Sequence, residues 1–341
     1  MSAVPLLKGA IENLGKFIVK RVLWMIPVLL CVLLIIFVLL EITPGDPALS
    51  ILPSDQWTEE NIAQVHEDLG LDDPLIVRYF RYLGGVLQGD LGTSYLNKTS
   101  VTAEVMQKFP YTLKITFISV VIALVAGLPI GVIAATHQYT LTDNIAVFIS
   151  LIFVSMPNFW FALLLVRFFG VQLGWLPTTG VETWQGYILP SVSVAITSLA
   201  TITRQTRSSM LEQIRADYVT TARAKGQTEQ KVIYAHALRN ALIPIITIVG
   251  TNVANHLGGT LVAETIFSIP GLAKYMITAL NGRDYPVVQG TVLFISAVFC
   301  VVMMVVDIIY TVVDPRMRVQ MIKKGKGGGK KAKARKEAVA A

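Results

Sequence analysis

Six apolar runs, separated by polar segments, set the pattern of this chain. The first, Val22–Leu40, holds 19 uncharged residues, enough for a helix to cross a hydrocarbon core of about 30 Å. Five more runs follow, at about residues 111–135, 145–169, 187–206, 238–262 and 287–313. This pattern predicts an all-α polytopic membrane protein with six transmembrane helices.

A cleaved signal peptide is the alternative interpretation of the first run. The hydrophobic region of such a peptide usually has about 7–15 residues and ends at a small-x-small cleavage site. The run here is longer, and Leu39–Pro44 offers no such site. We therefore expect an uncleaved helix over residues 17–41, preceded by a cytosolic segment of residues 1–16.

Residues 42–110 have a different composition, with ten acidic and four basic side chains. Amphipathic spacing predicts short helices over Thr58–Leu69 and Leu75–Leu87, with Thr58 near a helix start. The apolar residues of this stretch are too frequent for a disordered linker. We expect a folded extracytoplasmic insert between the first and second transmembrane helices.

Composition narrows the class of protein. The chain is 53% hydrophobic and only 15% charged, with a net charge of +7, whereas soluble domains carry about 25% charged residues. The basic residues flank the apolar runs without interleaved aromatics, which favours membrane orientation over nucleic-acid binding. Both cysteines lie in apolar runs and the four histidines are scattered, so we expect neither a disulfide framework nor a metal site.

Lysine and arginine also predict the orientation. With the N-terminus inside, the cytosolic segments hold 21 of these residues and the outer segments 7. Because cytosolic loops are enriched in positive charge, we expect both termini and residues 207–237 to lie in the cytosol. The basic, glycine-rich residues 315–341 form a cytosolic tail whose charge suits anionic lipid.

Residues 215–244 form the longest polar interruption of the apolar second half. They predict two short helices that meet at Gly226, a residue suited to the left-handed conformation that ends a helix. Asp217 can cap the first helix and Thr228 can start the second. Such an elbow would present a small, rigid surface to a cytosolic partner.

Polar residues inside the apolar runs are candidates for a substrate path, since such groups at membrane depth normally face a cavity or another helix. Interhelical hydrogen bonding at a subunit contact is the alternative, and the sequence leaves both open. The candidates inside the runs are Asn158, Asn252, Asn255 and His256, and Glu264 is a further candidate just after the outer end of the fifth run.

The chain resembles the permeases of binding-protein-dependent ABC importers, most closely their dipeptide/oligopeptide/nickel branch. The resemblance rests on Ala222-x-x-x-Gly226 followed by His236–Pro244, and on short matches spread over residues 17 to 318. These matches are Thr43–Ala48, Gly89–Ser94, Glu264–Leu272, Arg283–Gly290 and Asp314-Pro-Arg316. Thr220-Thr221-Ala222 stands where the family has Glu-Ala-Ala, so no role of that glutamate transfers to this chain.

The resemblance implies a transport subunit, not an enzyme. Its permease core would span residues 111–314, and its coupling helix would contact an ATPase through Asp217, Thr220, Thr221, Ala222, Ala224, Gly226 and His236. No phosphate-binding loop motif occurs in the chain, so ATP and Mg are expected on two separate ATP-binding subunits. The other implied partners are a second permease subunit, expected to differ from this one in sequence, and a substrate-binding protein on the outer side of the inner membrane.

Peptides are the expected substrate of such an importer. The importer is expected to work by alternating access between its two membrane subunits. Nickel chelate, glutathione and oligosaccharide remain open, because the external binding protein does much of the selecting. A secondary transporter would need inverted repeats and paired ionisable residues at the midplane, and Asp307 lies near an inner end instead. An intramembrane hydrolase would need a nucleophile beside a base, which no spacing here provides.

Overall fold

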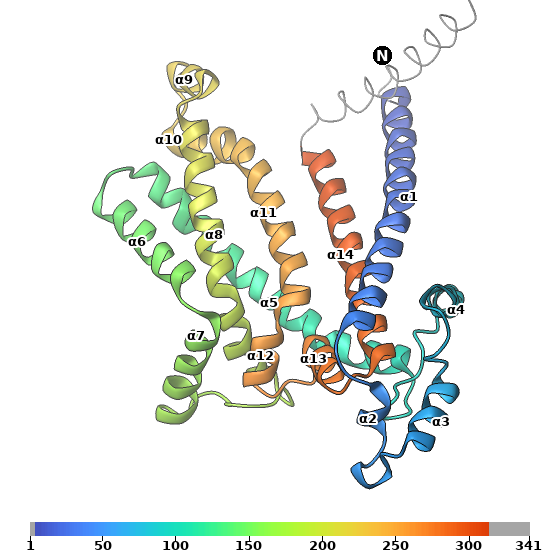
Figure 1. Ribbon diagram of the computed structural model, residues 1–341. Coiled ribbons are helices and arrows are strands. Elements are labelled where there is room, and N and C mark those ends of the chain that lie inside the picture. The colour runs from blue at the N-terminus through green and yellow to red at the C-terminus, as the bar shows by residue number, and fades with distance from the viewer. Residues whose placement is uncertain (1–3, 314–341) are drawn as a thin grey trace, which may run out of the picture.

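The computed structural model describes residues 4–313, and these residues fold almost entirely into helices (Figure 1). The predicted tail, residues 315–341, and the motif Asp314-Pro-Arg316 lie outside the described part. The long helices are α1 (Val4–Ile42), α5 (Val101–Thr136), α6 (Leu141–Ser155), α8 (Ile188–Ile214), α11 (Leu238–Gly259) and α14 (Tyr285–Val313). The shorter helices are α2 (Pro47–Ile51), α3 (Glu59–Leu69), α4 (Leu75–Leu87), α7 (Asn158–Leu165), α9 (Asp217–Ala224), α10 (Glu229–Lys231), α12 (Leu261–Ile266) and α13 (Leu272–Asn281).

Five of the helical segments are long and apolar enough to span a membrane, counting within the described residues. A sixth span is broken, because α6 and the helix Asn158–Gln172 meet at a bend of 102°. The break follows from Pro157, which cannot continue a helix from the preceding residue without losing a hydrogen bond. Five straight spans and one bent pair therefore match the six predicted apolar runs.

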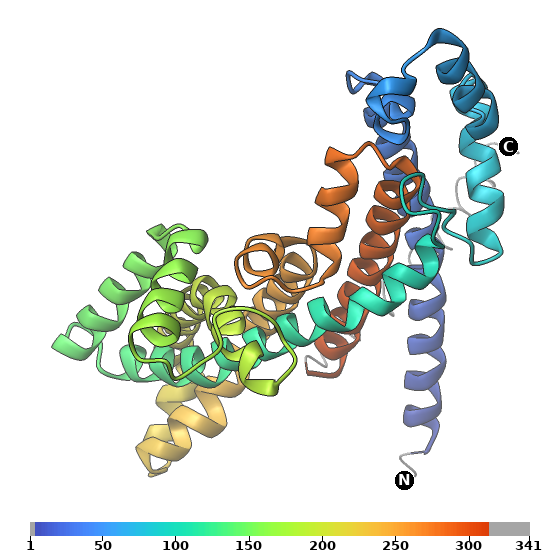
Figure 2. The same cartoon turned by 90° about the horizontal axis from the view of Figure 1, so that it is seen from below.

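Helix α8 lies at the centre of the second half and packs closely on α5 (Figure 1). Two glycines of α5 make this approach possible. A Cβ on Gly131 would lie 2.6 Å from the carbonyl oxygen of Thr203, and one on Gly127 would lie 3.0 Å from that of Leu199. Small residues at this spacing let helix backbones meet in a membrane. Figure 2 shows α5 crossing from the group of α1 and α14 to the group of α6, α7 and α8.

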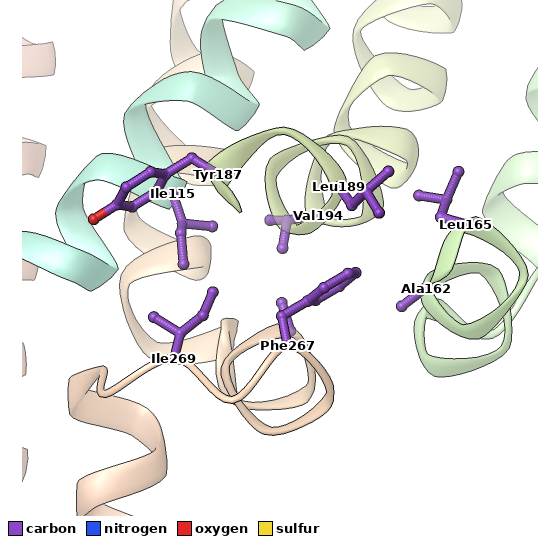
Figure 3. Packing of buried hydrophobic residues seen from close by; sticks show 9 residues of the cluster. Ile115, Ala162, Leu165, Tyr187, Leu189, Val194, Phe267 and Ile269 are labelled. Carbon is purple, nitrogen blue, oxygen red and sulfur yellow. The ribbon is translucent and has the colours of Figure 1, made fainter. Parts of the chain in front are cut away.

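An apolar cluster joins the first half of α5, the first turns of α8, and helices α7 and α12 (Figure 3). Phe267 is almost completely buried at its centre, and its ring points toward Ala162 below Val194 and Leu189. The cluster also contains Ile115, Leu165, Tyr187, Ala263 and Ile269. It holds the loop after α12 against the α5–α8 pair.

The insert between α1 and α5 folds as predicted into short helices. Thr58 caps α3, since its hydroxyl oxygen accepts a hydrogen bond from the Asn61 amide at 3.3 Å. α4 covers Leu75–Leu87, the predicted range. The insert is tied to the start of α14 by Asp284, a buried carboxylate that accepts bonds from the Ser94 hydroxyl at 2.5 Å and the Tyr95 amide at 2.9 Å.

Candidate coupling site

α9 forms the tip of a helical elbow that projects from the ends of α8 and α11 (Figure 1). Gly226 follows α9 with φ of +74°, as the sequence predicts, and no atom lies within 4 Å of where its Cβ would be. The chain then passes through α10 and a π-helical turn, η4 (Val232–Ala237), directly into α11. From Glu229 onward, α10, η4 and α11 form one continuous helical path into a membrane span.

The predicted cap of α9 is wrong in one detail. Ala216 occupies the N-cap position and makes no side-chain bond, whereas Asp217 is the first helical residue. A carboxylate in the first turn still interacts favourably with the helix dipole. Thr228 does precede α10 as its N-cap residue, also without a side-chain bond.

One side of α9 packs on its own subunit. Val219 and Ala222 join an apolar cluster with Val132 and Ala135 from the end of α5. The cluster is completed by Met210, Val232, Ile233, Ala237 and Ala241. Ala222 is only 7% exposed, so its small side chain serves the contact between α9 and the rest of this chain. Of the residues proposed from the sequence to contact an ATPase, Ala222 is the one that the structure turns inward.

The opposite side of α9 is open. The exposed residues here are Asp217, Thr220, Thr221, Ala224 and Gly226. His236 is half-buried, and its Nε2 lies 2.7 Å from Oε1 of Gln227, so it braces the residue after Gly226. Arg223 forms an ion pair of 2.6 Å with Glu229 across the elbow, and this carboxylate raises the pKa of the Arg223 guanidinium.

A second clamp, which the sequence did not reveal, holds the turn between α5 and α6. Arg207 of α8 donates two hydrogen bonds to Asp143, from Nε at 2.5 Å and from Nη2 at 2.7 Å. The same carboxylate accepts the amide of Tyr139 at 3.0 Å, and Tyr139 has an uncommon positive φ of 65°. The Asp143 side chain is 2% exposed, so this pair fixes the turn against the end of α8 that leads into α9.

The polar candidates in the spans fall into two groups. Asn255 is exposed on α11, whereas Asn252 and His256 are half-buried. Nε2 of His256 lies 2.7 Å from the Ser198 hydroxyl, and the Asn158 side-chain oxygen accepts a bond of 2.9 Å from Thr197, so both join α8 to its neighbours. Asn158 and Asn255 are both exposed, and Asn158 is the one of the two that bonds to α8.

Glu264 is fully buried at 0% exposure. One carboxylate oxygen accepts the hydroxyls of Thr112 and Thr260, each at 2.7 Å, and the other accepts the Lys274 amide at 2.8 Å. The carboxylate therefore lies at the N-terminus of α13, where the helix dipole favours a negative charge. Its contacts join α5, α12 and α13, so this buried carboxylate secures the loop that follows α12 and is not an exposed polar group.

Within residues 4–313 no group of three or more histidine, cysteine, aspartate or glutamate side chains could hold a metal ion. The elbow presents the exposed residues of α9 on a buried apolar cluster. Its geometry is that of a mechanical contact, an exposed helix face on a rigid support.

Two family models match the chain. Residues 127–319 match the binding-protein-dependent transport system inner membrane component, and residues 14–116 match the N-terminal region of such membrane components. The first match contains the elbow, α8 and α11, and the second contains most of α1 and the insert. Together they cover both groups of helices.

Similar proteins agree with this assignment. A glutathione transport system permease protein (GsiC) of Salmonella paratyphi A is 39% identical over 303 residues, covering 89% of this chain and 99% of that protein. An oligopeptide transport system permease protein (AppB) of Bacillus subtilis is 40% identical over 316 residues, with the same coverage of 89% and 99%. A dipeptide transport system permease protein (DppB) of Alkalihalophilus pseudofirmus is 37% identical over 330 residues, again with 89% and 99% covered.

The fold also resembles a solved transporter. An inward-facing structure of the MetNI methionine ABC transporter aligns with a TM-score of 0.54 at 19% identity, covering 62% of this chain and 96% of that one. The alignment leaves 38% of this chain unmatched. The chain belongs to the binding-protein-dependent ABC importer permeases, as a multi-pass inner-membrane transport subunit that works with an ATPase and a binding protein.

Proposed function

We propose that this chain forms half of the translocation pathway of an ATP-driven importer of short peptides, with glutathione, a tripeptide, within the same substrate class. The three relatives named above are permeases for glutathione, oligopeptides and dipeptides. A second permease would supply the other half, and two ATP-binding subunits would carry ATP and Mg. An external binding protein would deliver the peptide.

The observation that carries this proposal is the exposed face of α9 on its buried support. Thr220, Thr221 and Ala224 face away from the cluster that contains Val219 and Ala222. A short helix fixed along one side can transmit a push applied to the other side without deforming. ATP-driven closure of the ATPases would thus reach α11 through η4, and α5 through the apolar cluster.

A polar stripe on α11 supports a peptide path. Thr247, Thr251 and Asn255 are exposed, four residues apart, on one face of this membrane-spanning helix. Exposed amide and hydroxyl groups at this depth favour a water-filled cavity over lipid. Neutral donors and acceptors of this kind suit the amide groups that every peptide shares, whatever its side chains.

The test compares a tryptophan substitution on the exposed side of α9 with one at an exposed position far from α9. Ala224→Trp should leave the permease pair at normal membrane levels, abolish uptake per assembled complex and let the ATPases be washed off. Glu60→Trp, an exposed position in the insert, is the matched control and should leave uptake unchanged. Normal uptake by Ala224→Trp complexes that retain their ATPases would refute the docking role of this face.

The proposed orientation is tested separately. Both termini and the elbow would lie in the cytosol, with the insert outside. In a background without Cys31 and Cys300, a cysteine at Thr58 should react with an impermeant label in intact cells. A cysteine at Gln227 should react only after permeabilisation, and labelling of Gln227 from outside would contradict the proposed coupling.

A further inference from the structure

α4 exposes a strongly apolar face although it belongs to the insert. Phe80 is 61% exposed and Leu87 is 82% exposed, and Ile76 and Val77 are exposed beside them. Ile76, Phe80 and Leu87 follow the i, i+4, i+11 spacing of one helix face. Soluble surfaces rarely gather so many large apolar side chains on one short helix.

The other face of α4 lies against the outer half of α1. Tyr79 packs edge-on against Phe37 with ring centroids 5.6 Å apart, and its hydroxyl donates to the carbonyl oxygen of Leu30 at 3.2 Å. Leu30 is the midpoint of the span Ile18–Ile42. Because a helix rises 1.5 Å per residue, Leu30 lies roughly 18 Å along α1 from either end of that span. α4 therefore reaches the depth of the hydrocarbon core. Figure 1 shows it beside the lower part of α1, on the side away from α11.

The charges of α4 agree with this depth. The helix contains two charged residues, Arg78 and Arg81, and each is paired with a carboxylate. Arg78 reaches Glu41 at the outer end of α1, and Arg81 reaches back to Asp73, before the start of the helix. Long arginine side chains commonly extend in this way toward the membrane surface while their stems stay in the apolar layer.

We propose that α4 is inserted into the outer leaflet of the bilayer beside α1, with Ile76, Phe80 and Leu87 in contact with lipid acyl chains. The apolar surface of α1 at Leu34, Val38 and Leu39 is exposed within the same span, so α4 extends a surface that the membrane already covers. The segment predicted as an extracytoplasmic insert is thus divided. α3 stays in the aqueous phase, and α4 anchors it to the membrane.

The experiment places a fluorophore on single cysteines in the assembled transporter. Phe80→Cys and Leu87→Cys report on the exposed face of α4, and Glu60→Cys, exposed on α3, is the matched control in the same insert. Cys31 and Cys300 are first replaced. Each labelled complex is reconstituted in phosphatidylethanolamine/phosphatidylglycerol vesicles with or without nitroxide-labelled lipid, and is separately titrated with iodide.

The expected result is loss of fluorescence with nitroxide lipid at positions 80 and 87, together with protection from iodide. A fluorophore at position 60 should keep its fluorescence with nitroxide lipid and should be quenched by iodide. Quenching of positions 80 and 87 by iodide alone would overturn the proposal, because the face would then be in water. Protection from both quenchers, with cross-linking of position 80 to the second permease or to the binding protein, would also overturn it in favour of a protein contact.

If Phe80→Cys prevents assembly, Ile76→Cys probes the same face one turn earlier. Failure of transport has no bearing on this test, which reads only the surroundings of α4. The membrane placement and the proposed peptide transport can therefore fail independently.

Discussion

Removal of the Asp143 carboxylate tests whether the clamp between α6 and α8 supports coupling. Asp143→Ala deletes both Arg207 bonds and the bond to the Tyr139 amide. Arg207 is 25% exposed, so its guanidinium would remain largely buried without a carboxylate. Breaking a buried pair from one side costs about 3–5 kcal/mol. Partial exposure of Arg207 places the expected loss near the lower figure, about 3 kcal/mol, which is roughly a hundredfold in an equilibrium constant.

The chain provides its own control in the same region. Arg223 and Glu229 form an ion pair on the exposed side of the elbow, with side chains 38% and 61% exposed. Such surface pairs contribute about 0–1 kcal/mol. Glu229→Ala should therefore change the free energy of unfolding far less than Asp143→Ala does.

The assay is equilibrium unfolding of the purified complex in mixed micelles, with uptake and ATPase activity measured on the same preparations. We expect Asp143→Ala to lose stability and to hydrolyse ATP with little uptake. The double variant Asp143→Leu/Arg207→Met removes both charges and should be milder than Asp143→Ala, because no unpaired charge stays buried. A loss in Asp143→Ala no larger than that in Glu229→Ala would refute the reasoning.

Three further predictions follow from the backbone and the insert. Gly226→Val should lose uptake at near-normal membrane levels, since the positive φ of 74° costs a β-branched residue about 1–2 kcal/mol. The control Gly258→Val should transport normally, because Gly258 has no positive φ and open space where its Cβ would be. Gly131→Val should reduce recovery of the folded subunit on size exclusion, because overpacking of the α5–α8 contact costs about 1–3 kcal/mol. The hydrogen bond to Asp46 holds the pKa of His66 above its ordinary value of 6.5, so this bond stabilises the insert fully below that pH and less as pH rises through the folded-state pKa. Limited proteolysis of the insert should therefore speed up at alkaline pH, and His66→Asn should remove that dependence.

Local signals in the sequence predicted much of the fold. The six apolar runs located the spans, and Thr58 and Gly226 marked a helix start and a helix end that the structure confirms. α5 begins at Val101, earlier than the predicted span from residue 111, because its first turns are helical but carry Glu104 and Lys108, which an apolar pattern cannot detect.

Contacts between distant segments could not be predicted in the same way. Ala222 lies on the inner side of α9 because of contacts with Val132 and Ala135, about 90 residues earlier in the chain. Asp143 and Arg207 are 64 residues apart, and no local spacing relates them. Glu264 and Asn255 look alike in sequence as polar groups in or beside an apolar run, and the structure shows that Glu264 is buried among the hydroxyls of Thr112 and Thr260.

The central position of α8 has a consequence for how the chain is made. In the most apolar stretch of this span 72% of the residues are buried, whereas the corresponding figure for α1 is 11%. The buried residues of α8 include Ser191 and Thr203. A newly synthesised α8 alone in lipid would lack most of its stabilising contacts, because its hydroxyls and small side chains have their partners on α5. The Ser119 hydroxyl bonds to the carbonyl oxygen of Ser191 at 3.0 Å, and Thr203 bonds to that of Gly127 at 3.3 Å. Because α5 precedes α8 in the chain, this partner is already present when the ribosome delivers α8, and the two helices can enter the bilayer as a pair.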